Sequence, residues 1–132
     1  MPGAHSAFTA ARAEAEKIVR ARPGSAGPLR ALALIDAELG QKEIAIQEGR
    51  AVCDLEPVEK DAVFGVLRLT DLARIYALTG EKDLASQQLE IVSKLPCGPS
   101  YGELRLNPDW DALRGDPRFE KIVASLAPKK ER

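Results

Sequence analysis

Cysteine and histidine are scarce in this sequence, which contains two cysteines and one histidine. Cys53 and Cys97 are far apart, and neither belongs to a Cys-x-x-Cys motif or has a histidine nearby. The spacing of a typical metal site is therefore missing. His5 lies at the start of the chain, where we expect an exposed side chain and not a rigidly held general base. We predict reduced cysteines, with Cys53 as a small buried apolar residue, and no bound metal.

The sequence also lacks an excess of charge and a long apolar run. A formal net charge of -1 gives no clustered basic surface of the kind that holds nucleic acid. No stretch is apolar for long enough to cross a bilayer, and the first twenty residues do not resemble a secretion signal. We therefore predict one cytoplasmic domain that neither binds nucleic acid nor inserts into a membrane.

Known catalytic motifs are missing as well. There is no Gly-rich phosphate loop, no Gly-x-Ser-x-Gly and no His-Glu-x-x-His. The pair Asp109 and Asp111 could support acid-base chemistry, but acids at the start of a helix are common for capping and dipole reasons alone. Trp110 could stack on a ligand, yet a tryptophan near Leu113 and Phe119 is more typical of core packing. We predict that the chain is not an enzyme and uses no cofactor.

What the sequence does contain is helical periodicity, punctuated by glycine and proline. Runs of alternating β-branched residues are almost absent, so strands are not expected. In the first segment, Phe8, Ala11, Ala15 and Ile18 recur at steps of three and four and form one apolar stripe. The pattern predicts an all-α domain made of four segments: 6–22, 26–57, 61–96 and 100–127.

The second and third of these segments each read as a helical hairpin, and the two align at an offset of 40 residues. Glycine at position 49 costs about 1 kcal/mol of helix propensity relative to alanine, so we expect a close packing contact there. The alignment pairs Gly40 with Gly80, Ala45 with Ala85, Gly49 with Leu89, Val52 with Val92 and Leu32-Ala33 with Leu72-Ala73.

This pattern resembles the tetratricopeptide repeat. Leu-Ala stands at the Leu-Gly position of that family, Tyr76 at its tyrosine, Ala45 and Ala85 at its alanine, and Pro57 at its closing proline. The offset exceeds the usual repeat of about 34 residues, and we place the extra residues in 58–65 as a longer loop and an added helical turn. The resemblance implies antiparallel hairpins stacked as a short right-handed solenoid.

In the same register, the segment 6–22 matches the second half of an earlier repeat, so we expect the chain to be a fragment of a longer repeat protein. The tail resembles the closing segment of tetratricopeptide arrays at the C-terminus of bacterial multi-domain signalling proteins, where they follow protein kinase or adenylate cyclase domains. Asp116 can cap a helix that has Pro117 at its first position. We predict that residues 100–127 cap the last hairpin.

The resemblance implies a non-catalytic module that binds a peptide or another protein on the concave face formed by the first helix of each hairpin. Chaperone-binding members of the family hold a carboxylate with a lysine, asparagine and arginine clamp, but Leu34 stands where that clamp uses asparagine. The same positions also fit an ordinary solvated face. The inward-facing positions outside the core are Arg30, Leu34, Glu38, Thr70, Arg74 and Leu78.

A structural role is the alternative, because the first helix lacks its partner in the repeat register. Its stripe of Phe8, Ala11, Ala15 and Ile18 would then be exposed. An exposed apolar stripe of this kind often pairs with a second copy of the chain. The alternative prediction is therefore a homodimer formed through the segment 6–22.

Overall fold

A computed structural model describes residues 2–128 of the chain, with side chains for residues 6–128. Within that range the chain forms α-helices and one short 3-10 helix, and no strand, which confirms the all-α prediction. The side chain of His5 lies outside the described residues. The elements are α1 (Pro2–Ala21), α2 (Ala26–Glu38), α3 (Lys42–Leu55), α4 (Ala62–Leu78), α5 (Lys82–Val92), α6 (Tyr101–Leu106), η1 (Pro108–Leu113) and α7 (Pro117–Leu126).

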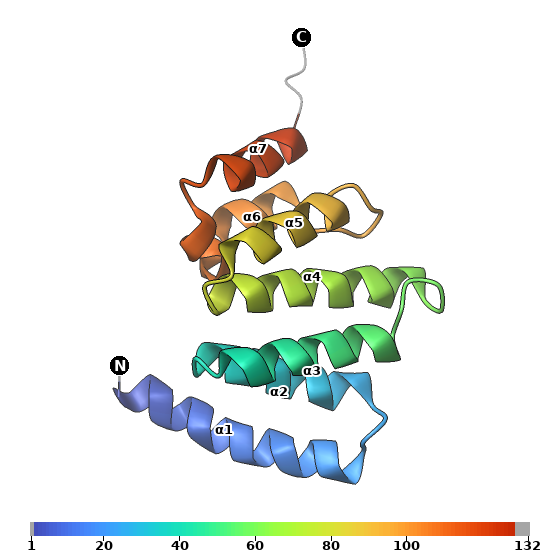
Figure 1. The fold of residues 1–132 in the computed structure, drawn as a ribbon, viewed down its shortest axis with the longest axis vertical. Coiled ribbons are helices and arrows are strands. Elements are labelled where there is room, and N and C mark those ends of the chain that lie inside the picture. The colour runs from blue at the N-terminus through green and yellow to red at the C-terminus, as the bar shows by residue number, and fades with distance from the viewer. Residues whose placement is uncertain (1, 129–132) are drawn as a thin grey trace.

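The helices stack along one axis, from α1 at one end to α7 at the other (Figure 1). The helix α2 packs against α1, α3 and α4, and α4 packs in addition against α5 and η1. At the C-terminal end, α7 contacts α5 and α6. The helix α4 therefore lies at the centre of the fold and joins the two hairpins to the C-terminal elements.

The two hairpins turn in the same way. Gly40 and Gly80 have φ angles of 78° and 84°, a conformation that glycine adopts without strain. The N–H of Gly40 donates to the carbonyl of Ala37, and the N–H of Gly80 donates to that of Ala77. The next N–H in each turn also reaches back into the last turn of the helix, which is the Schellman pattern of helix ends. The two turns that the 40-residue offset aligns therefore have the same geometry.

Gly49 has the packing reason that its position predicts. A Cβ atom there would lie 2.8 Å from Cδ1 of Ile75 and 3.2 Å from Cδ1 of Leu72. The absence of a side chain lets α3 approach α4 closely, which offsets the helix propensity that glycine lacks. Both neighbours are ends of flexible side chains, so this contact is softer than a contact with backbone.

The loop between the hairpins depends on a second close approach. Asp61 caps α4 by accepting hydrogen bonds from the N–H groups of Val63 and Phe64. One turn later, a Cβ atom on Gly65 would lie 2.5 Å from Cα of Val58 and 3.0 Å from the carbonyl carbon of Pro57. Residues 56–61 therefore form a loop that lies directly against the first turn of α4.

Replacing Gly65 with alanine should therefore lower the free energy of unfolding by about 1–3 kcal/mol, because a methyl group cannot fit without moving the loop backbone. Gly102→Ala is the matched control, since Gly102 also lies in a helix but has no atom within 4 Å of the added Cβ. Urea unfolding followed by circular dichroism measures both. Equal stability of the two variants would contradict the close packing of Gly65.

The C-terminal elements α6, η1 and α7 contribute buried residues to the larger core cluster. Trp110, Leu113 and Phe119 are fully buried. Asp116 caps α7 by accepting a hydrogen bond from the N–H of Arg118. The sequence does not predict α6, which contains Gly102, a poor helix former. Residues that pack together in this cluster are Leu72, Ala73, Tyr76, Ala77, Ala85, Leu89, Val92, Leu104, Trp110, Leu113, Phe119 and Ile122.

None of the helices among residues 2–128 combines the length and the apolar character needed to traverse a lipid bilayer.

Candidate functional site

The residues predicted to bind a partner come from α2 and α4, which lie side by side. We call this surface the α2/α4 face and define it by Arg30, Leu34 and Glu38 from α2 together with Leu67, Asp71 and Arg74 from α4. On α4 these three residues are spaced by four and three positions and so share one side of the helix.

An ion pair joins the two helices across this face. Arg30 on α2 holds Asp71 on α4 through both carboxylate oxygens, with Nε 2.5 Å from Oδ2 and Nη2 3.2 Å from Oδ1. This hydrogen bonding raises the pKa of Arg30. The Arg30 side chain remains 37% exposed. A bidentate pair is geometrically specific, so it fixes the spacing of the helices and leaves one edge of the guanidinium accessible.

Arg74 has more internal partners than the sequence indicates. Its Nη1 donates to Asp71 at 3.1 Å, its Nη2 donates to Oε1 of Glu103 at 2.7 Å, and its Nε lies 3.2 Å from Oδ2 of Asp109. The guanidinium carbon lies 5.6 Å from the ring centroid of Trp110, within cation-π range. Arg74 therefore connects α4 to the C-terminal elements, and only 16% of its side chain is exposed.

Glu103 shows the effect of this contact. Burial alone would raise its pKa, but hydrogen bonds and charge from Arg74, with further hydrogen bonds from Asn107 and Trp110, lower the pKa of Glu103 overall. The carboxylate is thus held in its charged form, and the ion pair with Arg74 persists at neutral pH.

Three other predicted residues differ in how much they contribute to the face. Thr70 is buried, and its hydroxyl donates to the carbonyl of Val66 in its own helix, so it is not part of the accessible surface. Leu34 and Leu78 are half-buried and pack against the small core cluster of Ala33, Ala37, Ala45 and Ile75. Their apolar side chains lie mostly beneath the surface and expose little area that a partner could contact.

Glu38 is the exposed acid of the face. It makes no ion pair with any of the side chains described for residues 6–128. Partial burial and the nearby charge of Asp109 raise the pKa of Glu38. A cation placed beside it would relieve that repulsion, which makes Glu38 a natural contact for a basic group.

The structure adds an apolar patch that the sequence analysis misses. Val63, Phe64 and Leu67 near the start of α4 have exposed fractions of 50%, 46% and 39%. We call these three residues the α4 patch. The guanidinium of Arg68 lies 5.6 Å from the Phe64 ring centroid, and Arg68 also donates to Glu56. Val63 and Leu67 are four residues apart, and similar spacings lead on to Asp71 and then to Arg74. This pattern could have indicated from the sequence that the apolar residues lie on the same side of α4 as the charged ones.

The stripe predicted for self-association is divided in the structure. Ala15 is buried and Phe8 is half-buried, whereas Ala11 is exposed and Ile18 is 48% exposed. The cause is that α1 packs against α2 and turns part of the stripe toward it. The four residues therefore do not form one continuous exposed surface, and Ile18 is the large side chain of the stripe that stays exposed.

A buried acidic cluster lies where α1, α2 and α3 meet. Asp36 is fully buried, and its Oδ1 accepts from Nε of Arg12 at 2.5 Å. Glu48 lies within hydrogen-bonding reach of Asp36, and burial followed by this contact raises the pKa of Glu48 to about 8. Because two charged carboxylates would repel each other there, Glu48 keeps its proton at neutral pH and shares it with Asp36.

Most of the groups with potential chemistry are engaged in structural contacts. Glu81 pairs with Lys42, and Asp111 pairs with Arg114. Cys53 is half-buried and donates to the carbonyl of Arg68, and burial raises the pKa of Cys53 to about 11, which keeps it a thiol. Cys97 is exposed. Within the described range, no three His, Cys, Asp or Glu side chains are grouped closely enough to hold a metal ion.

No family model, curated protein or solved structure matches the chain.

Proposed function

We propose that this chain is a non-catalytic protein-interaction module, built of tetratricopeptide-like hairpins, that binds a peptide or protein segment on its α2/α4 face. The observation that carries the proposal is the α4 patch. Val63, Phe64 and Leu67 are exposed on one helix and adjoin a fixed network of charges. Contiguous exposed apolar side chains bordered by polar groups are typical of protein-binding surfaces.

The chemistry of the face indicates what its partner presents. The α4 patch at the start of α4 favours one or two apolar side chains, and the exposed Glu38, at the end of α2 and so at the other end of the face, favours a basic residue. Arg30 and Arg74 already have carboxylate partners, so they fix the shape of the surface and contribute less free charge than the sequence suggests. We propose a short segment that combines apolar residues with a Lys or Arg.

Selection from a random peptide display library tests this proposal, with the purified chain as the target. Selected peptides should lose at least about tenfold in affinity for Leu67→Glu, because a charge would be placed under their apolar side chains. Ile91→Glu is the matched control, since Ile91 is an equally apolar residue, 55% exposed, on α5. If the two variants bind the peptides equally, or if no peptide is selected, the proposal is wrong.

A structural role through self-association is the second candidate, and the 48% exposure of Ile18 favours it. Light scattering over a concentration series measures the molar mass. A dimer that Ile18→Glu returns to monomer would support this role, whereas a monomer at every concentration would eliminate it. The two candidates use different helices, so their tests are independent.

The cellular location and the parent protein that the sequence predicts are also part of the proposal. We propose that the module acts in the cytoplasm and that it belongs to a longer protein, of which a bacterial signalling protein with a kinase or cyclase domain is one candidate and another parent protein remains open. The C-terminal position of this segment in such proteins would make the module the part that recruits a partner.

A further inference from the structure

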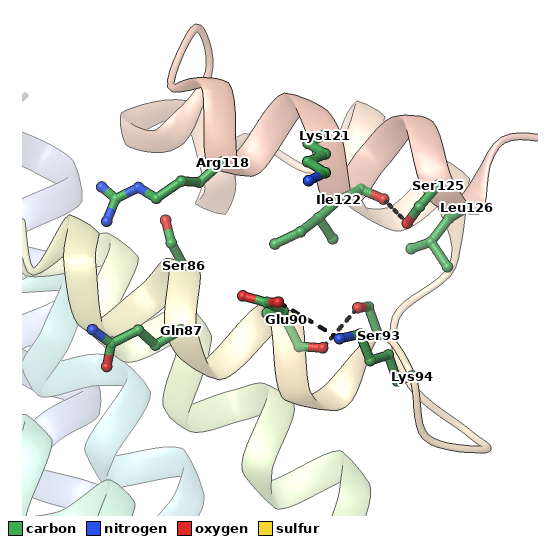
Figure 2. A pocket seen from close by; sticks show the side chains of 10 residues that line it. All are labelled: Ser86, Gln87, Glu90, Ser93, Lys94, Arg118, Lys121, Ile122, Ser125 and Leu126. Atoms are coloured by element: carbon green, nitrogen blue, oxygen red, sulfur yellow. Dashed lines mark hydrogen bonds and ion pairs between the residues drawn. The ribbon is translucent and has the colours of Figure 1, made fainter.

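A groove separates α5 from α7, in a part of the molecule that the proposed peptide-binding face does not include. Its volume is about 580 Å³, which is within the usual range for small-molecule sites. Figure 2 shows the two helices running along opposite sides of it, with side chains from both directed into the space between them.

Ser86 is the unusual residue of this groove. It is 3% exposed, and its hydroxyl has no hydrogen-bond partner among the described residues. The other two serines of the groove are satisfied: Ser93 donates to the carbonyl of Glu90, and Ser125 donates to that of Ile122. In Figure 2 the Ser86 oxygen points from α5 toward α7, near Arg118. A buried hydroxyl without a partner costs free energy, which a ligand acceptor would recover.

One cation of this groove has no acidic partner among the residues that the structure describes. Arg118 is neutralised, because its Nη1 lies 2.8 Å from Asp83 and its Nη2 lies 2.9 Å from Asp116. Lys121, one turn further along α7, pairs with no carboxylate among residues 6–128. Figure 2 shows its ammonium group directed from α7 toward the groove. An anion placed between Ser86 and Lys121 would accept from both.

The remainder of the groove is suited to an apolar chain. Ile122 and Leu126 follow Lys121 on α7 and point toward α5. Opposite them, Glu90 and Lys94 form an ion pair with Nζ 3.5 Å from Oε1, so their charges largely cancel. From Ser86, seven residues of α5 extend the groove by roughly 10 Å, at 1.5 Å per residue.

We propose that the α5/α7 groove binds a carboxylate with a medium-length alkyl chain. The carboxylate accepts hydrogen bonds from the Ser86 hydroxyl and the Lys121 ammonium, and the chain lies along Ile122 and Leu126. The ligand belongs to the fatty-acid class, and its binding requires no change in the α2/α4 face.

Titration of the full chain with decanoate, below its micelle concentration and followed by amide chemical shifts, tests this proposal. We expect saturable shifts confined to α5 and α7. Acetate, which has the head group alone, and decanol, which has a similar chain without the charge, should each bind at least about tenfold more weakly. The acetate and decanol arms thus test the alkyl chain and the carboxylate separately.

Three variants complete the test. Lys121→Glu and Ser86→Ala should each weaken decanoate binding by about tenfold or more, since each removes a hydrogen bond to a charged group. Lys60→Glu, at an exposed lysine in the loop before α4, makes the same charge change away from the groove and should leave binding unaltered. Shifts outside α5 and α7, equal binding of decanol, or unchanged binding by Lys121→Glu would each overturn the proposal.

Discussion

Replacing Trp110 with alanine should lower the free energy of unfolding by about 3–5 kcal/mol, the largest effect that we expect from a single substitution in this chain. Trp110 is fully buried in the larger core cluster, and its helix η1 packs against α4 and α5. Its ring also lies beneath the Arg74 guanidinium, and its Nε1 donates to Glu103 at 3.4 Å. The substitution leaves a cavity and removes a contact of the ion pair that joins α4 to the C-terminal elements.

The loss should be measured by urea unfolding followed by circular dichroism, because the variant has no tryptophan fluorescence. Ile91→Ala is the matched control. Ile91 is a large apolar residue in α5 that is 55% exposed, so its truncation should change stability by less than about 0.5 kcal/mol. If the two variants were equally stable, the C-terminal elements would not cover the core in the way that we describe.

The free energy of unfolding should decrease as the pH rises from about 5 to about 8, and Glu48→Gln should remove much of this decrease. The pKa of Glu48 is raised to about 8, by burial first and by Asp36 second. In the unfolded chain this carboxyl group has its ordinary pKa near 4.5. Between these values the folded state holds a proton that the unfolded state releases, so each increase in pH favours unfolding.

The slope from this one group is at most about 1.4 kcal/mol per pH unit, and solvent screening of the half-buried Glu48 narrows the pH range over which this slope applies. A glutamine at position 48 offers Asp36 an amide donor at every pH. The groups that face Glu48 are Asp36 from α2 and Arg12 and Glu16 from α1, so the change should be greatest where these helices meet.

Chemical denaturation at several pH values, for the wild type and the variant, measures the effect. Glu43→Gln is the control, since Glu43 is exposed on the same helix and should keep the pH dependence of the wild type. Parallel pH profiles for the wild type and Glu48→Gln would contradict a shared proton in the acidic cluster.

Much of the fold follows from local sequence signals. The turns at Gly40 and Gly80 and the caps at Asp61 and Asp116 depend on residues within a few positions, and all four lie where the sequence predicts a turn or a helix start. The packing role of Gly49 is also predictable, because glycine inside a helix is costly unless a neighbour requires it.

The site was less predictable, because its groups are defined by contacts between distant segments. The periodicity that places Arg74 on the proposed binding face cannot show that Glu103 and Asp109 fold back onto it. Similarly, Asp36 aligns with Tyr76 of the second hairpin, and the alignment does not indicate that a buried Asp36 forms an ion pair with Arg12 of α1. Such pairs depend on how three helices meet, which a pattern along one helix does not contain.

The α4 patch has a similar explanation. The helix α4 begins one turn earlier than α2 does when the two hairpins are aligned. Val63 and Phe64 belong to this additional turn, so they extend beyond the part of α4 that aligns with α2. Without an aligned neighbour to cover them, these apolar residues remain exposed. The same excess of residues that distinguishes the second hairpin from the first thus creates the surface that we propose to be functional.

Mapping the contact of a selected peptide by amide chemical shifts tests the central claim most directly, because it locates the binding surface without assuming a partner. Our account predicts that the largest shifts fall on α2 and on the first half of α4, around Arg30, Glu38 and the α4 patch. Shifts concentrated on α1, or on α5 and α7 with α2 and α4 unchanged, would contradict it.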